Sequence, residues 1–191
     1  MSDTADIDLH EPAAAVRGPV PAALRRFIWD MQSMVELDGG EREILLIGGD
    51  LMARLIADDH WLPAVFAKPG ISGACQYQLY HDGLERFSVV CTVLAPGAAL
   101  PAAPQPLWEI TGVLRGDLTR TVADGRSPRI CTRGAVDLRG SGREAMQQLA
   151  NLSAEHAAIA IHVYGGQRAG CINPPDAPPY DIWSIQTEIR D

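Results

Sequence analysis

From Pro69 onward, the sequence consists of short segments of alternating apolar and polar residues separated by glycine and proline. Turn signals such as Asp82-Gly83 and Pro96-Gly97 separate these segments, and no helical segment lies between them. Many short strands at close spacing are typical of an antiparallel sandwich or barrel. Strands are predicted over residues 76–81, 86–94, 107–115, 117–122, 135–138, 157–164 and 181–189.

The segment before these strands has helical periodicity instead. Apolar residues in 21–37 recur at the spacing of one helix face, and Gly39-Gly40 ends this first helix. Residues 41–58 predict a second helix with an acidic first turn. We therefore expect a single domain over 21–191. Its N-terminal part, 21–60, is helical, its β-barrel covers 70–191, and residues 1–20 form a disordered tail.

The charge and the cysteine content limit the classes of function. A net charge of −8 argues against nucleic acid and against an anionic membrane surface as partners, because both attract basic patches. The four cysteines are widely spaced without a C-x-x-C pair, which favours reduced thiols over a zinc ribbon. The acidic N-terminus lacks the apolar stretch of a signal peptide, and no apolar run is long enough for a membrane span. A cytoplasmic protein is expected.

Three residues near the middle of the chain match a known strand-pair motif. Gly97, Glu109 and Gly116 fall on the fixed positions of the pattern Gly, five residues, His-x-His, three residues, Glu, six residues, Gly. This pattern is typical of metal-binding cupins. The two histidine positions of the pattern hold Ala103 and Gln105 in this chain.

Three further segments extend the similarity to a specific family. The segments Leu84–Val90, Gly112–Gly116 and Ile161–Gly166, in this order, resemble bacterial proteins of the cysteine dioxygenase superfamily, which includes 3-mercaptopropionate dioxygenases. The resemblance covers residues from about 22 to about 166. It implies a mainly β fold, the cupin double-stranded β-helix or jelly-roll barrel, with N-terminal helices. It also implies ferrous iron held by three histidines, at which a thiol is oxidised to a sulfinate.

The resemblance places the three iron ligands at positions that no longer hold histidine. The first two are Ala103 and Gln105, and the third, four residues before Asn151, is Gln147. Alanine has no donor atom, and a glutamine amide oxygen is a neutral, weak ligand suited at best to Ca²⁺ or Mg²⁺. We therefore expect neither iron nor another cofactor in this site.

Several polar residues of the family pattern remain. Successive side chains of a strand point to opposite faces, so Gln105 and Glu109 are predicted to share the barrel interior. The same rule puts His162 and Tyr164 on one face of their own strand. The resemblance places Gln76 at the contact with the substrate carboxylate and gives Tyr164 a role near the substrate. A glutamate inside a barrel is costly unless it is paired or protonated. Arg120 and Arg133 are the candidate partners, and a bulge in the strand would instead turn Glu109 to solvent.

Three functional interpretations stay open at this point. In the first, the chain has lost iron chemistry and keeps the barrel without catalysis, either as a pocket for a small molecule, a thiol or a carboxylate, or as a partner-binding or regulatory subunit. In the second, it is a metal-free enzyme in which His162 and Tyr164 act as base and acid and Glu109 tunes the histidine. In the third, a rearranged metal site on Glu109, His162 and a further carboxylate retains thiol dioxygenase activity.

Two structural interpretations stand beside these functional ones. His162 and Tyr164 could instead form a hydrogen-bonded polar pair with a purely structural role, because buried polar groups must be satisfied. The terminal strand could close the edge of the barrel or pair with a second copy of the chain, which leaves a homo-oligomer open.

Overall fold

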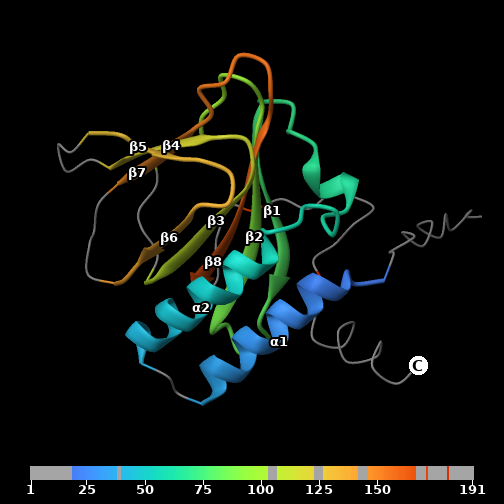
Figure 1. Cartoon of the computed structure of the whole chain (residues 1–191), viewed down its shortest axis with the longest axis vertical. Coiled ribbons are helices and arrows are strands. Elements are labelled where there is room, and N and C mark those ends of the chain that lie inside the picture. The colour runs from blue at the N-terminus through green and yellow to red at the C-terminus, as the bar shows by residue number, and fades with distance from the viewer. Residues whose placement is uncertain are drawn as a thin grey trace, which may run out of the picture.

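The computed structural model describes residues 19–37, 40–102, 107–122, 127–141, 146–166, 171 and 180 (Figure 1). Two α-helices and a short 3₁₀ helix precede the strands: α1 (Ala22–Glu36), α2 (Glu41–Leu55) and η1 (Ala64–Ala67). The strands are β1 (Ala74–His81), β2 (Phe87–Leu94), β3 (Glu109–Arg115), β4 (Leu118–Val122), β5 (Arg129–Cys131), β6 (Val136–Arg139), β7 (Gln147–Ala150) and β8 (Ala158–Gly165).

The strands form two antiparallel sheets. The larger sheet has the order β1-β2-β8-β3-β6 and the smaller one the order β5-β4-β7. Residues 98–100 run beside β7, because Ala99 forms an antiparallel bridge with Ala150 and Leu100 N donates to Leu149 O at 2.8 Å. The smaller sheet therefore has four rows, and the order of the two sheets is that of a double-stranded β-helix. The predicted fold class is confirmed.

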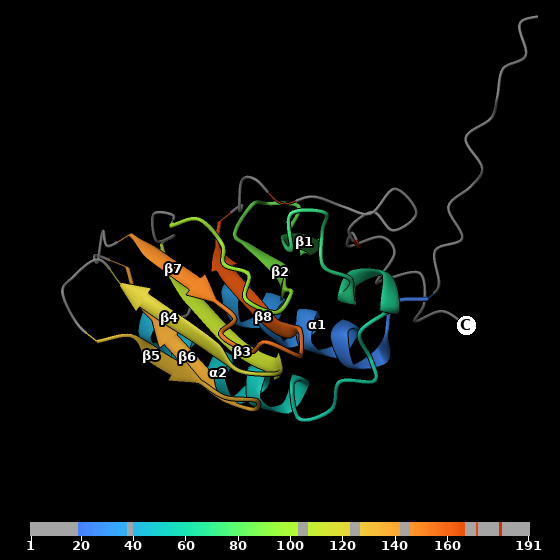
Figure 2. The ribbon, with the colours of Figure 1, turned by 90° about the horizontal axis from the view of Figure 1, so that it is seen from above.

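The large sheet lies between the helices and the small sheet (Figures 1 and 2). Its helix-facing side chains belong to the main core, which also contains Leu24, Phe27, Ile28 and Met31 of α1. The opposite face contributes to a second apolar cluster between the sheets: Leu94, Val113, Leu118, Cys131, Leu149, Ala158 and Ala160. Successive residues of a strand point to opposite faces, so each strand serves both clusters.

Helix α2 packs against the sheet through glycine. A Cβ atom added at Gly112 of β3 would lie 2.7 Å from Cγ of Met52 and 2.9 Å from Cγ2 of Ile56. On the helix side, Gly48 faces Ile110 equally closely. The Gly48-Gly49 pair has low helix propensity, and the structure shows what it allows: a close approach of helix and sheet that side chains would prevent.

Three details differ from the sequence-based prediction. Strands β5 and β7 were not predicted, and α2 ends at Leu55 rather than at residue 58. Residues 1–18 of the predicted tail lie outside the described residues, whereas Val20 at its end is buried in the main core. Of the predicted terminal strand and its flank, only Tyr180 is described; its N donates to Leu79 O at 2.7 Å.

No described helix is both long and apolar enough to span a bilayer.

Candidate functional site

The candidate site begins as two neighbouring residue pairs on strands β3 and β8. Glu109 pairs with Tyr164, and Thr111 pairs with His162. Because the two pairs are two residues apart on each strand, all four side chains share the face that looks toward the small sheet. All four residues are buried, with His162 at 0% and Glu109 at 1% exposure.

Glu109 is at the centre of the hydrogen bonds in this region. Its Oε1 accepts from Thr111 Oγ1 at 2.8 Å and lies 3.0 Å from His162 Nδ1. Its Oε2 accepts from Gln147 Nε2 at 3.0 Å. Burial raises the pKa of Glu109, but the hydrogen bond with His162 and the charge of Arg120 outweigh burial and hold this pKa well below its ordinary range. The carboxylate is therefore ionised at neutral pH.

Arg120 supplies the positive charge from the opposite sheet. It follows the interior residue Leu118 by two positions on β4, so both point between the sheets. Its Nη2 donates to Thr111 Oγ1 at 2.8 Å and lies 3.4 Å from Glu109 Oε1. Its Nη1 lies 3.1 Å from Asp137 Oδ2. The structure thus selects Arg120 as the partner of Glu109, whereas the alternative, Arg133, is exposed.

Gln147, on β7, uses both ends of its amide within the same cluster. Its Nε2 donates to Glu109, and its Oε1 accepts from Arg120 Nη1 at 3.4 Å and from Arg139 Nη1 at 2.5 Å. Asp137 carries a second arginine, Arg129, whose Nη1 lies 2.6 Å from its Oδ1. The charges at this end of the barrel are therefore arranged as contacts between opposite signs.

His162 and Tyr164 are stacked. Their ring centroids lie 5.3 Å apart with 6° between the planes. Ala160, two residues earlier, belongs to the apolar cluster between the sheets. Strand β8 thus divides the barrel interior into an apolar end at Ala158 and Ala160 and a polar end at His162 and Tyr164.

Three other residues of the family pattern lie apart from this cluster or outside the described residues. Gln76 donates to Thr92 Oγ1 at 3.1 Å. Across the sheet, Gln76 pairs with Thr92 on β2, and Thr92 pairs with Ala160 on β8. The β1 residue in line with His162 across the sheet is Gln78, because Gln78 pairs with Val90 and Val90 pairs with His162. Ala103 and Gln105 lie outside the described residues.

Asn151, which marked Gln147 as the third ligand position, has structural contacts. Its Nδ2 donates to the backbone oxygens of Leu94, Ala95 and His156 at 3.1, 3.1 and 2.8 Å. These bonds hold together two loops at the apolar end of the barrel. The contacts explain this asparagine without a ligand.

The sequence prediction did not include Thr111, Asp137 and Arg139. Thr111 could have been found, because parity places it on the same face as Glu109. Asp137 and Arg139 alternate with apolar residues in Val136–Arg139, but only the pairing of β6 with β3 shows which neighbours they meet. Their part in the cluster depends on tertiary structure.

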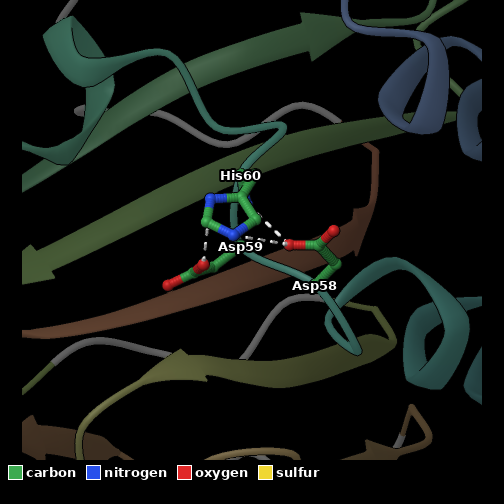
Figure 3. Close-up of side chains that lie close together, drawn as sticks. All are labelled: Asp58, Asp59 and His60. Atoms are coloured by element: carbon green, nitrogen blue, oxygen red, sulfur yellow. Dashed lines mark hydrogen bonds and ion pairs between the residues drawn. The ribbon is translucent and has the colours of Figure 1, made fainter.

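One group of potential metal-binding side chains is found among the described residues, at Asp58, Asp59 and His60 (Figure 3). It lies in the segment after α2, far from the polar cluster in sequence, and His60 is almost fully exposed. Asp59 Oδ2 already accepts from Arg115 Nε at 2.7 Å, and this hydrogen bond lowers the pKa of Asp59. An ion at this group would compete with Arg115 for Asp59, and exposed acidic groups are common without a bound ion.

The barrel residues do not fit ferrous iron either. Of the three ligand positions that the resemblance implies, two hold glutamine and one holds alanine. The described one, Gln147, directs its only acceptor atom at two guanidinium groups. A divalent cation beside Gln147 and Glu109 would face Arg120 at a similar distance, and like charges repel strongly in a buried site.

Comparison with known proteins found similar solved structures but no family. No protein-family model matches the sequence. An RmlC-like cupin family protein with a double-stranded β-helix fold from Methanocaldococcus jannaschii aligns with 15% identity over 52% of this chain and 85% of its own length, with a TM-score of 0.43. A cupin-like protein from Thermotoga maritima aligns with 20% identity over 56% of this chain and 81% of its own, with a TM-score of 0.45.

KdgF from Halomonas aligns with 15% identity over 51% of this chain and 82% of its own length, with a TM-score of 0.42. Similarities at this level carry no information about the activity of this chain. The assignment of the fold rests on the order of the strands in the two sheets.

Proposed function

We propose that this chain is a cysteine-dioxygenase-like barrel that has lost the three-histidine iron site and binds a small molecule without a metal and without catalysis. It would do so as a cytoplasmic protein. The observation that carries the proposal is the position of Arg120. Its Nη1 lies 3.5 Å from Glu109 Oε2 and 3.4 Å from Gln147 Oε1.

The guanidinium of Arg120 takes the electrostatic role that a metal would have in this barrel. It is permanently charged, so it balances Glu109 at any pH at which the protein is folded. Its planar group of donors reaches Glu109, Thr111 and Gln147 together. With these contacts in place, the polar end of the barrel is a connected network that does not depend on an ion.

The proposed ligand is a small thiol or carboxylate. The resemblance to thiol dioxygenases suggests this class, and the contacts of Arg120 support it. Among the described residues, no hydrogen-bond acceptor contacts the buried Nε of Arg120. A buried donor of this kind favours a ligand with an acceptor group, because an unsatisfied donor costs free energy.

Metal analysis tests the first half of the proposal. The purified full-length protein is incubated anaerobically with Fe²⁺, dialysed, and measured for bound iron and for oxygen consumption with cysteine and 3-mercaptopropionate. We expect bound iron far below one equivalent and no thiol-dependent oxygen consumption. Stoichiometric iron that survives dialysis would overturn the proposal.

The triple variant A103H/Q105H/Q147H is the matched control for this experiment. It restores imidazoles at the three positions given by the resemblance. Iron bound by this variant and not by the natural sequence would show that these positions are the cause of the loss. A thermal-shift series with small thiols and carboxylates tests the second half, since a ligand that binds the folded state raises the unfolding temperature.

One observation favours a second candidate, the metal-free acid–base enzyme that uses His162 and Tyr164. The carboxylate of Glu109 lies 3.0 Å from His162 Nδ1, an arrangement that orients an imidazole and stabilises its protonated form during proton transfer. This candidate predicts that a measured turnover is lost in both His162→Ala and Tyr164→Phe. A turnover unchanged in both variants would exclude it.

The third interpretation, thiol dioxygenase activity at a rearranged metal site, has less support. Such a site would use Glu109, His162 and a further carboxylate, for which Asp137, another partner of Arg120, is a candidate. Both carboxylates already contact Arg120. A metal would have to displace that arginine from a buried pair, which is costly.

A further inference from the structure

The hydrogen bonds around Thr111 have one consistent set of directions. Arginine can only donate, so Arg120 Nη2 donates to Thr111 Oγ1 across 2.8 Å. An ionised carboxylate can only accept, so the single hydroxyl hydrogen of Thr111 is donated to Glu109 Oε1, also across 2.8 Å. Thr111 therefore has no hydrogen left for His162 Nδ1, although its Oγ1 lies 3.1 Å from that atom.

These directions determine where the proton of His162 is. Nδ1 of His162 faces two oxygens, Glu109 Oε1 at 3.0 Å and Thr111 Oγ1 at 3.1 Å. Neither oxygen has a hydrogen to offer to Nδ1, so an unprotonated Nδ1 would place its lone pair against a carboxylate oxygen. A protonated Nδ1 instead makes a charge-assisted hydrogen bond with Glu109.

We infer that Arg120, Thr111 and Glu109 hold His162 as the neutral Nδ1–H tautomer, so that its other ring nitrogen, Nε2, is a proton acceptor. Thr111 is a positioning residue in this arrangement. It fixes Oε1 of Glu109 against the imidazole and connects that oxygen to the guanidinium of Arg120.

The charges around His162 favour the neutral form. Glu109 is shared with Arg120, and Asp137 is shared between Arg120 and Arg129. From β6, Arg139 adds a further positive charge at Gln147, while Tyr164 stacks on the ring itself. A second proton on His162, which is fully buried, would add positive charge where arginines already compensate the carboxylates.

The tautomer restricts what can contact Nε2. A group that approaches an unprotonated ring nitrogen has to donate a hydrogen bond. A ligand would therefore present a hydroxyl, thiol or ammonium group to His162, and the acceptor group of the proposed ligand would face Arg120 instead. This part rests on the proposed small-molecule site, whereas the tautomer itself does not.

Nitrogen NMR of the full-length protein labelled with ¹⁵N-histidine tests the inference without any ligand. The chain has five histidines, and single substitutions of His10, His60, His81 and His156 by glutamine identify the remaining signal. We expect, at neutral pH, a protonated Nδ1 and an unprotonated Nε2 for His162. An Nε2–H tautomer or an imidazolium at pH 7 would overturn the inference.

Two variants distinguish this arrangement from burial alone. Thr111→Ser keeps the hydroxyl and should keep the tautomer. Glu109→Gln replaces the acceptor by an amide that can also donate, and it should produce a mixture of the two tautomers. If Glu109→Gln does not fold, Thr111→Val replaces it, and its His162 signal should broaden or shift while that of Thr111→Ser does not. An unchanged signal in the variant used would contradict the inference.

The outcomes separate the two proposals. An Nδ1–H tautomer in a protein that binds no thiol or carboxylate would keep the inference and remove the proposed ligand. The opposite tautomer in a protein that does bind such a molecule would remove the inference alone.

Discussion

The two faces of the large sheet differ although they are built from the same strands. On β8, Ile159, Ile161 and Val163 point to the helices and belong to the main core. The alternating residues His162 and Tyr164 point to the small sheet and are just as buried. On one face each residue stabilises the fold by removing apolar surface from water, by about 1.5–3 kcal/mol for a large side chain.

The other face does not follow this rule at its polar end. A buried charge destabilises the fold unless it is paired and hydrogen-bonded, and well-packed apolar residues are often at least as stable. Glu109 and Arg120 therefore bring no evident advantage to folding over a pair of well-packed apolar residues. The comparison indicates that the helix face holds the domain together, whereas the polar end of the barrel is the part of the interior that needs an explanation by function.

The largest effect is expected when the polar face loses one charge. Arg120→Met leaves Glu109 buried without its cation and should lower the free energy of unfolding by about 3–5 kcal/mol, as measured by urea denaturation. The double variant Arg120→Met/Glu109→Leu removes both charges and should be more stable than the single variant. If the single variant lost less than about 1 kcal/mol, the pair would not be buried as described.

A comparable loss on the helix face should leave the site intact. Ile161→Ala removes a fully buried side chain next to His162 in sequence and should cost about 2–5 kcal/mol in urea denaturation. The His162 nitrogen signals should remain those of the natural protein, because the residue lies on the opposite face. A changed tautomer in Ile161→Ala would show that the two faces are not independent.

Acid should weaken the polar face selectively. The pKa of Glu109 is lower in the folded state than in the unfolded chain, where it is about 4.3. Its contribution to stability is therefore fully present above about pH 4.3 and is lost as the pH falls toward the folded-state pKa, by up to about 1.4 kcal/mol per pH unit. Urea denaturation at a series of acidic pH values measures this slope.

Glu109→Gln is the control for the acid series. Asp82 and Asp59 also have lowered pKa values and remain in the variant, so the difference between the two proteins isolates Glu109. The free energy of unfolding should fall less steeply in Glu109→Gln. Parallel slopes would mean that Glu109 is not the carboxylate that stabilises the folded state.

The smallest effect is expected for an ion pair outside the barrel. Asp59 and Arg115 form a contact of 2.7 Å, as short as those in the polar cluster, but their side chains are 23% and 39% exposed. Asp59→Asn should therefore change the free energy of unfolding by less than about 1 kcal/mol. A loss as large as that of Arg120→Met would show that burial does not distinguish the two pairs.

Sequence periodicity was sufficient for most of the fold. The helices and the long strands were predicted because their apolar residues recur at a fixed period over many positions. Strand β5 has three residues, of which Arg129 and Ile130 are exposed, so no period can be recognised. Strand β7 has only four residues, and its alternation is weak.

The sequence predicted the candidate site only where the alternation of side chains along a strand determines which face a residue is on. Parity places Glu109, His162 and Tyr164 on interior faces, and the structure has them there. It cannot show that Arg120, on the central strand β4 of the small sheet, reaches Glu109 while Arg133, between β5 and β6, does not, because this depends on how the two sheets face each other. Gln76, which was assigned from the family pattern, contacts Thr92 and lies outside the row of His162.

The position of β8 has a consequence for how the protein is made. This strand is the last one described in the chain, yet it lies at the centre of the large sheet between β2 and β3. Until residue 165 has left the ribosome, the two strands beside it have no common neighbour, and Glu109 lacks its imidazole. During translation the apolar strands β2 and β3 are therefore made before the strand that joins them, and unpaired strand edges of this kind are where incompletely folded chains tend to aggregate.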